Sequence, residues 1–203
     1  MVGATGYIGP PLAKVLQDAG HSVTVITRKP GFGAKRLPRG VEVAFVDGYA
    51  DEAVTRILRS VEAVVNLAGA NIGSWRWSVR RKKELLDSRI RTTSSLVDAM
   101  AKLSVQERPR TLVSASGIDY YGNVPDGLVS EDSPPGASFM ADLCTQWEDT
   151  ARQAENFGVR VALMRMGTVL GHRARPLQLR LLPFRLFIGG HFRPGTQWFC
   201  WIH

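Results

Sequence analysis

Short apolar segments alternate along the chain with longer amphipathic segments, and this alternation restricts the fold more than any other feature. The expected strands are residues 22–27, 41–46, 63–67, 111–116 and 160–165. The expected helices are residues 7–19, 51–59, 78–102 and 140–157. This order predicts an α/β fold with a doubly wound parallel sheet. Because the strand segments are apolar nearly throughout, we expect helices on both faces of the sheet.

Composition places the chain among ordinary globular proteins. Of 203 residues, 44% are hydrophobic and 22% charged, which excludes wholesale disorder. The length suits one large domain with part of a second, here 1–171 and 172–203. No apolar segment is long enough to predict a transmembrane helix. The isolated cysteines Cys144 and Cys200 exclude a cysteine zinc site and suit a reducing compartment.

The formal charge of +8 is concentrated near the end of the sequence. Residues 172–203 contain five arginines and no acidic residue, so the rest of the chain carries only 8 − 5 = +3. This distribution gives little support to nucleic-acid binding, and we expect no nucleic-acid partner. It favours a basic face, from Arg173 to Arg193, that is either solvated or turned toward a protein partner.

The most specific motif is GATGYIG at residues 3–9, a GxxGxxG directly before a predicted helix. Glycines at this spacing allow a tight turn, a close approach of a diphosphate to the backbone, and tight packing of the helix on the sheet. The amides of the helix start would bind the phosphates. The pattern predicts dinucleotide binding; a purely structural turn is the alternative. The candidate residues are Gly3, Thr5, Gly6, Tyr7, Ile8 and Gly9.

The end of the next strand predicts which dinucleotide binds. Arg28 and Lys29 stand where an acidic residue would bind the ribose 2′-hydroxyl of NAD. A guanidinium there instead suits the 2′-phosphate of NADP, although a solvated loop would also explain both residues. Gly69 ends a second small-residue segment at a strand's carboxyl end and is a further candidate for backbone contact with the nucleotide.

Only Met1 and Val2 precede the first glycine, although a strand at this point normally forms the centre of the sheet. We therefore expect either that residues are missing before Met1 or that another segment fills part of the central position.

Eight motifs in order carry a family resemblance. They are GATGYIG, VVNLAGANI, KKELLDSRIRTT, SASGIDYYG, EDSPPG, LCTQWEDTA, VALMRMGTVLG and QWFCWIH. With these motifs the chain resembles the atypical short-chain dehydrogenase/reductases called epimerase family proteins, which include plastid cell-division-inhibitor-like, or giant chloroplast, members. The resemblance covers essentially the whole chain.

This resemblance implies a Rossmann-like domain that binds NADP(H). It also implies an organelle, either chloroplast or mitochondrion, with the cytoplasm as the alternative and the protein either soluble or peripheral to a membrane. It implies coenzyme contacts at Thr27, Arg28, Leu67, Ala68, Glu84, Arg89 and Val169. The residues alone would have suggested an exposed helix pair for Glu84 and Arg89, and a core position for Val169.

The catalytic residues of the wider family are incomplete. Short-chain dehydrogenases use a serine, a tyrosine and a lysine four residues after the tyrosine. Ser116 stands where the serine belongs, but the tyrosine and lysine positions fall on Met140 and Cys144. Tyr120 and Tyr121 are nearby alternatives, with loop packing as their other explanation. We interpret Cys144 as a buried small residue, and the histidines have no spacing typical of a metal site.

The last thirty residues depart further from the family. Leucines and phenylalanines mix with Arg180 and Arg185 in a segment that we expect to form an amphipathic helix broken at Pro183. It could bind an anionic membrane surface, bind a partner protein, or pack on its own domain. The family continues past WIH into a substrate-binding lobe, which we expect to be largely absent here.

Two functions follow. The chain is either a weakly active or non-catalytic NADP(H)-binding subunit of a larger organellar assembly, or an NADP-dependent oxidoreductase or epimerase acting on a small carbonyl or nucleotide sugar. The missing tyrosine–lysine pair favours the first.

Overall fold

The computed structural model describes residues 1–28, 31, 34–48, 52–73, 76–171, 174–190, 195 and 198–203. Lys29, His172, Arg173, His191 and Arg193, which entered the predictions above, lie outside these residues. The chain forms two compact units. Unit 1 is Met1–Ala115 with Gln146–Met164, and unit 2 is Ser116–Thr145 with Arg165–His203.

Unit 1 contains a doubly wound sheet, as the sequence predicts. Its strands are β1 (Thr24–Thr27), β2 (Glu42–Phe45), β3 (Ala63–Asn66), β4 (Thr111–Gly117) and β5 (Arg160–Met166), of which β4 and β5 end in unit 2. β1 pairs in parallel with β2, and β3 in parallel with β4, which is hydrogen-bonded to β5. The two groups of strands are joined through Val2, which bridges in parallel to Ile26 and Asn66.

Val2 thus fills the centre of the sheet, with the order β2–β1–Val2–β3–β4–β5. Its amide donates to the carbonyl of Val65, and its carbonyl accepts from the amide of Leu67, both at 2.8 Å. Its side chain is fully buried. The order is that of a Rossmann fold, with a single residue in the place of the central strand.

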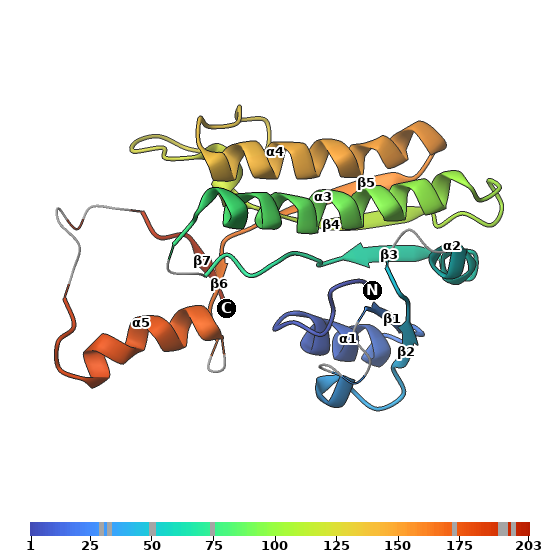
Figure 1. The fold of residues 1–203 in the computed structure, drawn as a ribbon, viewed down its shortest axis with the longest axis horizontal. Helices are drawn as coiled ribbons and strands as arrows, with labels where there is room; N and C mark the ends of the chain where they lie inside the picture. Colours follow the sequence, from blue (N-terminus) through green and yellow to red (C-terminus); the bar gives the residue numbers. More distant parts are fainter. Residues whose placement is uncertain are drawn as a thin grey trace. The chain divides into compact units, whose positions relative to one another are not determined.

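Helices cover the two faces of this sheet (Figure 1). They are α1 (Gly9–Asp18), α2 (Glu52–Leu58), α3 (Val79–Ala101) and α4 (Phe139–Arg152), with short 3₁₀ turns η1 (Ala34–Arg36) and η3 (Gln153–Phe157). Neighbouring residues of β1 point to opposite faces: Val25 packs in a small cluster with Ala13 of α1, and Ile26 in the larger cluster with residues of α2, α3 and α4. Alternation along one strand therefore builds two cores.

Unit 2 is smaller and holds the 3₁₀ turn η2 (Ile118–Tyr121), α5 (Arg175–Arg185) and a parallel pair of two-residue strands, β6 (Thr168–Val169) and β7 (Trp201–Ile202). The expected helix break at Pro183 is wrong, because α5 continues through Pro183 to Arg185. Only two helical residues follow the proline, so it disturbs little of the helix. The helix stops before Phe187, which has a positive φ of 58°.

The sheet is less covered than expected. Phe45 at the edge strand β2 is 51% exposed and Met164 of β5 is 49% exposed, although both lie in apolar segments. Sequence polarity alone therefore overestimated the burial of β2 and β5. The two units do not follow the division into 1–171 and 172–203, and a domain boundary at residue 171 stays a prediction.

Candidate functional site

The glycine turn, residues 3–9, brings its three glycines into different surroundings. Gly3 has φ 73°, and a Cβ there would lie 2.6 Å from the amide nitrogen of Ala68. A Cβ on Gly9 would overlap the backbone of Ala4, so α1 starts in direct contact with the turn. A Cβ on Gly6 would meet only the carbonyl oxygen of Gly3, at 3.5 Å. Gly3 and Gly9 therefore serve close packing, and Gly6 leaves backbone open to a ligand.

The start of α1 suits an anion. Prolines occupy its first turn, the N-cap Ile8 provides no side-chain cap, and the first turn contains no acidic residue. Pro10 and Pro11 carry no N–H and the amide of Leu12 donates to the carbonyl of Ile8, so the donors at this end are amides of the glycine turn that precedes the prolines. The helix dipole adds positive potential there. Diphosphate oxygens would find hydrogen-bond donors here without a competing carboxylate.

A cavity of about 1160 Å³ in unit 1 opens beside this turn. Its lining comes from the glycine turn, from the carboxyl ends of β1, β2 and β3, and from one side of α3. The sequence-predicted residues that line it are Gly3, Thr5, Gly6, Thr27, Arg28, Leu67, Ala68, Gly69 and Glu84. The meeting of strand ends at one edge of the sheet is the usual position for a ligand in a doubly wound fold.

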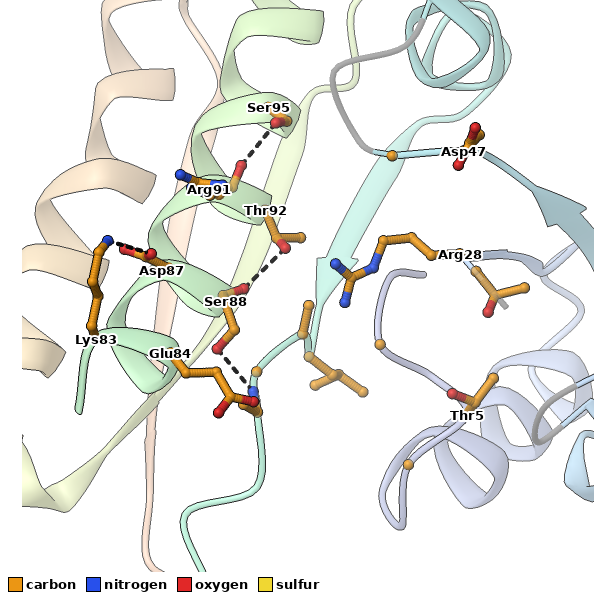
Figure 2. A pocket seen from close by; sticks show the side chains of 18 of the residues that line it. Thr5, Arg28, Asp47, Lys83, Glu84, Asp87, Ser88, Arg91, Thr92 and Ser95 are labelled. Carbon is orange, nitrogen blue, oxygen red and sulfur yellow. Dashed lines mark hydrogen bonds and ion pairs between the residues drawn. The ribbon is translucent and has the colours of Figure 1, made fainter. Parts of the chain in front are cut away.

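Arg28 is the basic residue of this lining at the end of β1. Figure 2 shows its side chain extending from the strand end toward α3, with Thr5 of the glycine turn nearby. Arg28 is exposed, whereas the preceding Thr27 is 7% exposed. A guanidinium at this strand end matches the position that accepts a 2′-phosphate.

The β3 turn, residues 67–70, is fixed by side chains on either side. The amide oxygen of buried Asn66 accepts from the amide of Ala68 at 3.1 Å. The hydroxyl of Ser88 on α3 accepts from the amide of Ala70 at 3.0 Å (Figure 2). The same hydroxyl donates to the carbonyl of Leu85. These bonds hold small residues at the strand end with their backbone facing the cavity.

The long helix α3 supplies lining residues that the sequence reasoning missed. Besides Glu84 they are Arg80, Lys83, Asp87, Ser88, Arg91, Thr92 and Ser95. They recur at spacings of three and four, so they share one side of the helix. That period was visible in the sequence, but only the fold shows which side faces the strand ends. Asp47, Gly48 and Ala70 were also missed.

Charges on α3 are paired along the helix. Lys83 and Asp87 form an ion pair of 2.6 Å, and Arg81 and Glu84 one of 2.7 Å. The hydrogen bond from Lys83 holds the pKa of the Asp87 carboxyl below its ordinary value. Asp87 therefore stays ionised at neutral pH and offsets part of the positive charge around the cavity.

Three predicted residues, Tyr7, Ile8 and Gly9, are not among the cavity-lining residues of the described chain. Arg89 also lies outside the lining: its guanidinium carbon would be 2.9 Å from a Cβ on Gly69. Arg89 therefore packs against the β3 turn at Gly69.

The catalytic candidates belong to unit 2. Ser116 is 6% exposed at the end of β4, and Tyr120 and Tyr121 form part of η2. One guanidinium nitrogen of Arg165 donates to the Tyr121 hydroxyl at 2.8 Å and to the carbonyl of Glu131 at 2.9 Å. The same guanidinium lies 3.5 Å from the ring centre of Tyr120.

Two further residues from the sequence analysis lie in regular elements. Val169 lies in β6 and pairs with Ile202 of β7. Cys144 is 2% exposed on α4, in keeping with its interpretation as a small core residue. Within the described part of the chain, no group of three or more His, Cys, Asp or Glu residues is arranged to hold a metal ion.

Comparison with known proteins identifies the family. The family model described as "NAD dependent epimerase/dehydratase family" matches residues 1–184. The chain belongs to this family. The epimerase family protein SDR39U1 homolog, chloroplastic, of Arabidopsis thaliana is 41% identical over 208 residues, covering 100% of this chain and 58% of that protein. The resemblance inferred from the motifs is confirmed.

Solved structures of the epimerase family agree with this assignment. The crystal structure of human epimerase family protein SDR39U1 with NADPH is 37% identical and has a TM-score of 0.80. The match covers 100% of this chain and 64% of the human chain. A nucleoside-diphosphate sugar epimerase from Corynebacterium glutamicum is 29% identical, with a TM-score of 0.77 and coverage of 99% and 40%. The chain thus spans less than two thirds of the length of these relatives.

Proposed function

We propose that this chain binds NADP(H) in the cavity of unit 1 and acts as a weakly active or non-catalytic subunit of a larger organellar assembly. The observation that carries the coenzyme assignment is the open backbone at Gly6, before a helix whose first turn contains no acidic residue, with Arg28 lining the same cavity. A relative of the same family is crystallised with NADPH, which supports the choice of coenzyme.

The residues present fit the dinucleotide by their chemistry. The glycine turn offers amides and an open surface to the diphosphate, Arg28 offers a planar cation to the 2′-phosphate, and residues 67–70 offer backbone to the rest of the nucleotide. When bound, NADPH supplies a hydride. The residues of this chain bind and orient the coenzyme.

The non-catalytic role rests on α4. Met140 and Cys144 lie on this helix at the positions of the missing tyrosine and lysine. A thioether does not titrate, and Cys144 is buried. The proposed organelle rests on the chloroplastic relative.

A protein partner is proposed for the basic segment from Arg173 to Arg193, of which residues 174–190 are described. Leu182, Phe184 and Phe187 are more than half exposed there, and Phe187 is 97% exposed. Apolar side chains grouped with Arg180 and Arg185 are typical of a surface that another protein covers. No helix in the described chain is long and apolar enough to cross a membrane.

The coenzyme assignment is tested by titrating the chain with NADPH and NADH in a calorimeter. We expect the chain to bind NADPH more tightly than NADH. Arg28→Glu should lower the affinity for NADPH by about a hundredfold, because it replaces a partner of the phosphate with a repelling charge. NADH affinity should change by less than about threefold, since NADH lacks the 2′-phosphate. Equal losses for both nucleotides would refute the role of Arg28, and an absence of binding would refute the assignment.

One contact favours the alternative, an NADP-dependent oxidoreductase or epimerase. The hydrogen bond from Arg165 leaves the Tyr121 hydroxyl its own proton to donate, and the guanidinium would stabilise the phenolate that remains. Tyr121 could then donate its proton to the oxygen of a carbonyl substrate, and NADPH, when bound, would supply the hydride that such a reduction needs.

The two functions are separated by label transfer. The chain is incubated with NADPH deuterated at C4 of the nicotinamide and a panel of small carbonyl compounds and nucleotide sugars. Stereospecific deuterium in a product, lost in Ser116→Ala and Tyr121→Phe, would establish the enzyme and overturn the subunit proposal. If the chain is isolated as a stable part of a large complex and transfers no deuterium, the enzyme hypothesis is overturned.

A further inference from the structure

The indole of Trp147 contacts two residues, Thr93 and Arg89, through which two supports of the β3 turn pass. Trp147 is on the part of α4 that belongs to unit 1 and is 6% exposed. Its ring nitrogen donates to the hydroxyl of Thr93 on α3 at 2.9 Å. Trp147 was part of a family motif in the sequence, but neither the motif nor the spacing gave it a role.

The first support is a chain of buried hydrogen bonds. The Thr93 hydroxyl oxygen accepts from Trp147 and also from the side-chain nitrogen of Asn66, at 2.9 Å. The Asn66 oxygen then accepts from the amide of Ala68, at 3.1 Å. Because the Asn66 oxygen accepts from the Ala68 amide, the Asn66 nitrogen faces the Thr93 hydroxyl, which also accepts from Trp147. These bonds together fix the orientation of the Asn66 side chain.

The second support passes through Arg89. Its guanidinium carbon lies 5.1 Å from the Trp147 ring centre, within cation–π range, and one of its nitrogens donates to the carbonyl of Leu85 at 3.0 Å. The guanidinium also occupies the space where a side chain on Gly69 would be. Arg89 therefore contacts the β3 turn at Gly69, one residue after Ala68, whose amide donates to Asn66.

We propose that Trp147 is the positioning residue of the coenzyme-binding β3 turn. It touches neither the cavity nor the coenzyme. It fixes Asn66 through Thr93, and Arg89 through its ring, so that Leu67, Ala68 and Gly69 present backbone to the cavity at one fixed depth. This inference rests on the proposed binding of NADP(H) in that cavity.

The first test uses Trp147→Phe, which keeps an aromatic ring beneath Arg89 but removes the indole N–H. We expect NADPH affinity to fall by about tenfold, at a temperature where circular dichroism shows the variant fully folded. Trp198→Phe is the matched control: it removes the indole hydrogen bond to the carbonyl of Pro125 in unit 2, and affinity should not change. Unchanged affinity in Trp147→Phe would overturn the proposal.

Thr93 provides the second variant pair. Thr93→Ser keeps the hydroxyl and should retain NADPH affinity. Thr93→Val removes the hydroxyl that accepts from both Trp147 and Asn66. It should lower the affinity for NADPH more than Trp147→Phe does. If Thr93→Ser and Thr93→Val lose affinity equally, packing rather than the hydrogen-bond chain sets the turn, and the proposal fails.

A coenzyme-free readout separates this inference from the proposed function. Hydrogen–deuterium exchange at the amides of residues 67–70 should accelerate in Trp147→Phe, while exchange in the β4 core stays as in the unmodified chain. Uniform acceleration, or none, would contradict positioning. A chain that binds no NADPH but shows the local acceleration would refute the proposed function and leave the positioning role supported.

Discussion

The three glycines of the glycine turn are identical in the sequence but differ in what surrounds them. The sequence predicts that glycine is needed here, because the motif is typical of nucleotide-binding turns. It does not say which glycine faces the ligand. That distinction depends on atoms from Ala4 and from the β3 turn, more than sixty residues away, and only the folded chain brings them together.

At the residue scale we predict opposite outcomes for two alanine substitutions. Gly6→Ala should leave the free energy of unfolding within about 0.5 kcal/mol of the unmodified chain, because its Cβ meets no close neighbour. Gly6→Ala should lower the affinity for NADPH at least tenfold, because the added methyl group occupies the space in which the diphosphate would lie. Urea unfolding and calorimetric titration measure the two effects.

Gly9→Ala is the matched control. Its Cβ would overlap the Ala4 backbone, so we expect a loss of stability of about 3 kcal/mol. If Gly6→Ala binds NADPH as tightly as the unmodified chain does, the diphosphate does not lie against Gly6.

At the scale of elements, most helices and strands of unit 1 could be predicted to within about two residues, because apolar patterning dictates them. The expected helix 140–157 is the exception, because α4 ends at Arg152 and the chain continues to Phe157 as the 3₁₀ turn η3. The cavity-facing side of α3 could not. Arg80, Ser88 and Ser95 look like solvent-exposed residues of a charged helix until the β3 turn is placed beside them. The pairing of β6 with β7 also escaped prediction, since two-residue strands carry no period.

The central position of the sheet yields a prediction about Val2. Val2→Ala keeps both backbone hydrogen bonds but removes two methyl groups from a fully buried site, and should lower the free energy of unfolding by about 2 kcal/mol. Val105→Ala, the same change at a site 76% exposed, should cost less than about 0.5 kcal/mol. Equal urea midpoints for the two variants would mean that Val2 does not hold the sheet together.

At the scale of the whole molecule, the stability of a chain that begins at Met1 depends on a titratable amine inside the sheet. The α-amino group of Met1 donates to the carbonyl of Thr24 at 2.7 Å inside the sheet, and burial lowers its pKa from 8.0 to about 6. Between these values the unfolded chain binds the proton and the folded chain does not. Stability from this group is therefore complete above pH 8 and is lost as the pH falls toward 6.

We expect the free energy of unfolding to rise by about 3 kcal/mol from this group between pH 5.5 and pH 9, at 1.4 kcal/mol per pKa unit. Urea unfolding across this range measures the total change. The comparison is the same chain acetylated at Met1, which keeps an N–H for Thr24 but cannot ionise. Parallel pH profiles for the two chains would disprove the contribution of the amine.

The placement of Met1 has a practical consequence for producing this protein. An affinity tag fused directly before Met1 would have to leave the molecule from between β1 and β3, where its first residues would meet the backbone of both strands. Residues paired with both strands would not offer the accessible, extended site that tag-removing proteases need. A spacer ahead of Met1, or a handle placed on the exposed tip near Leu128, would avoid the obstruction.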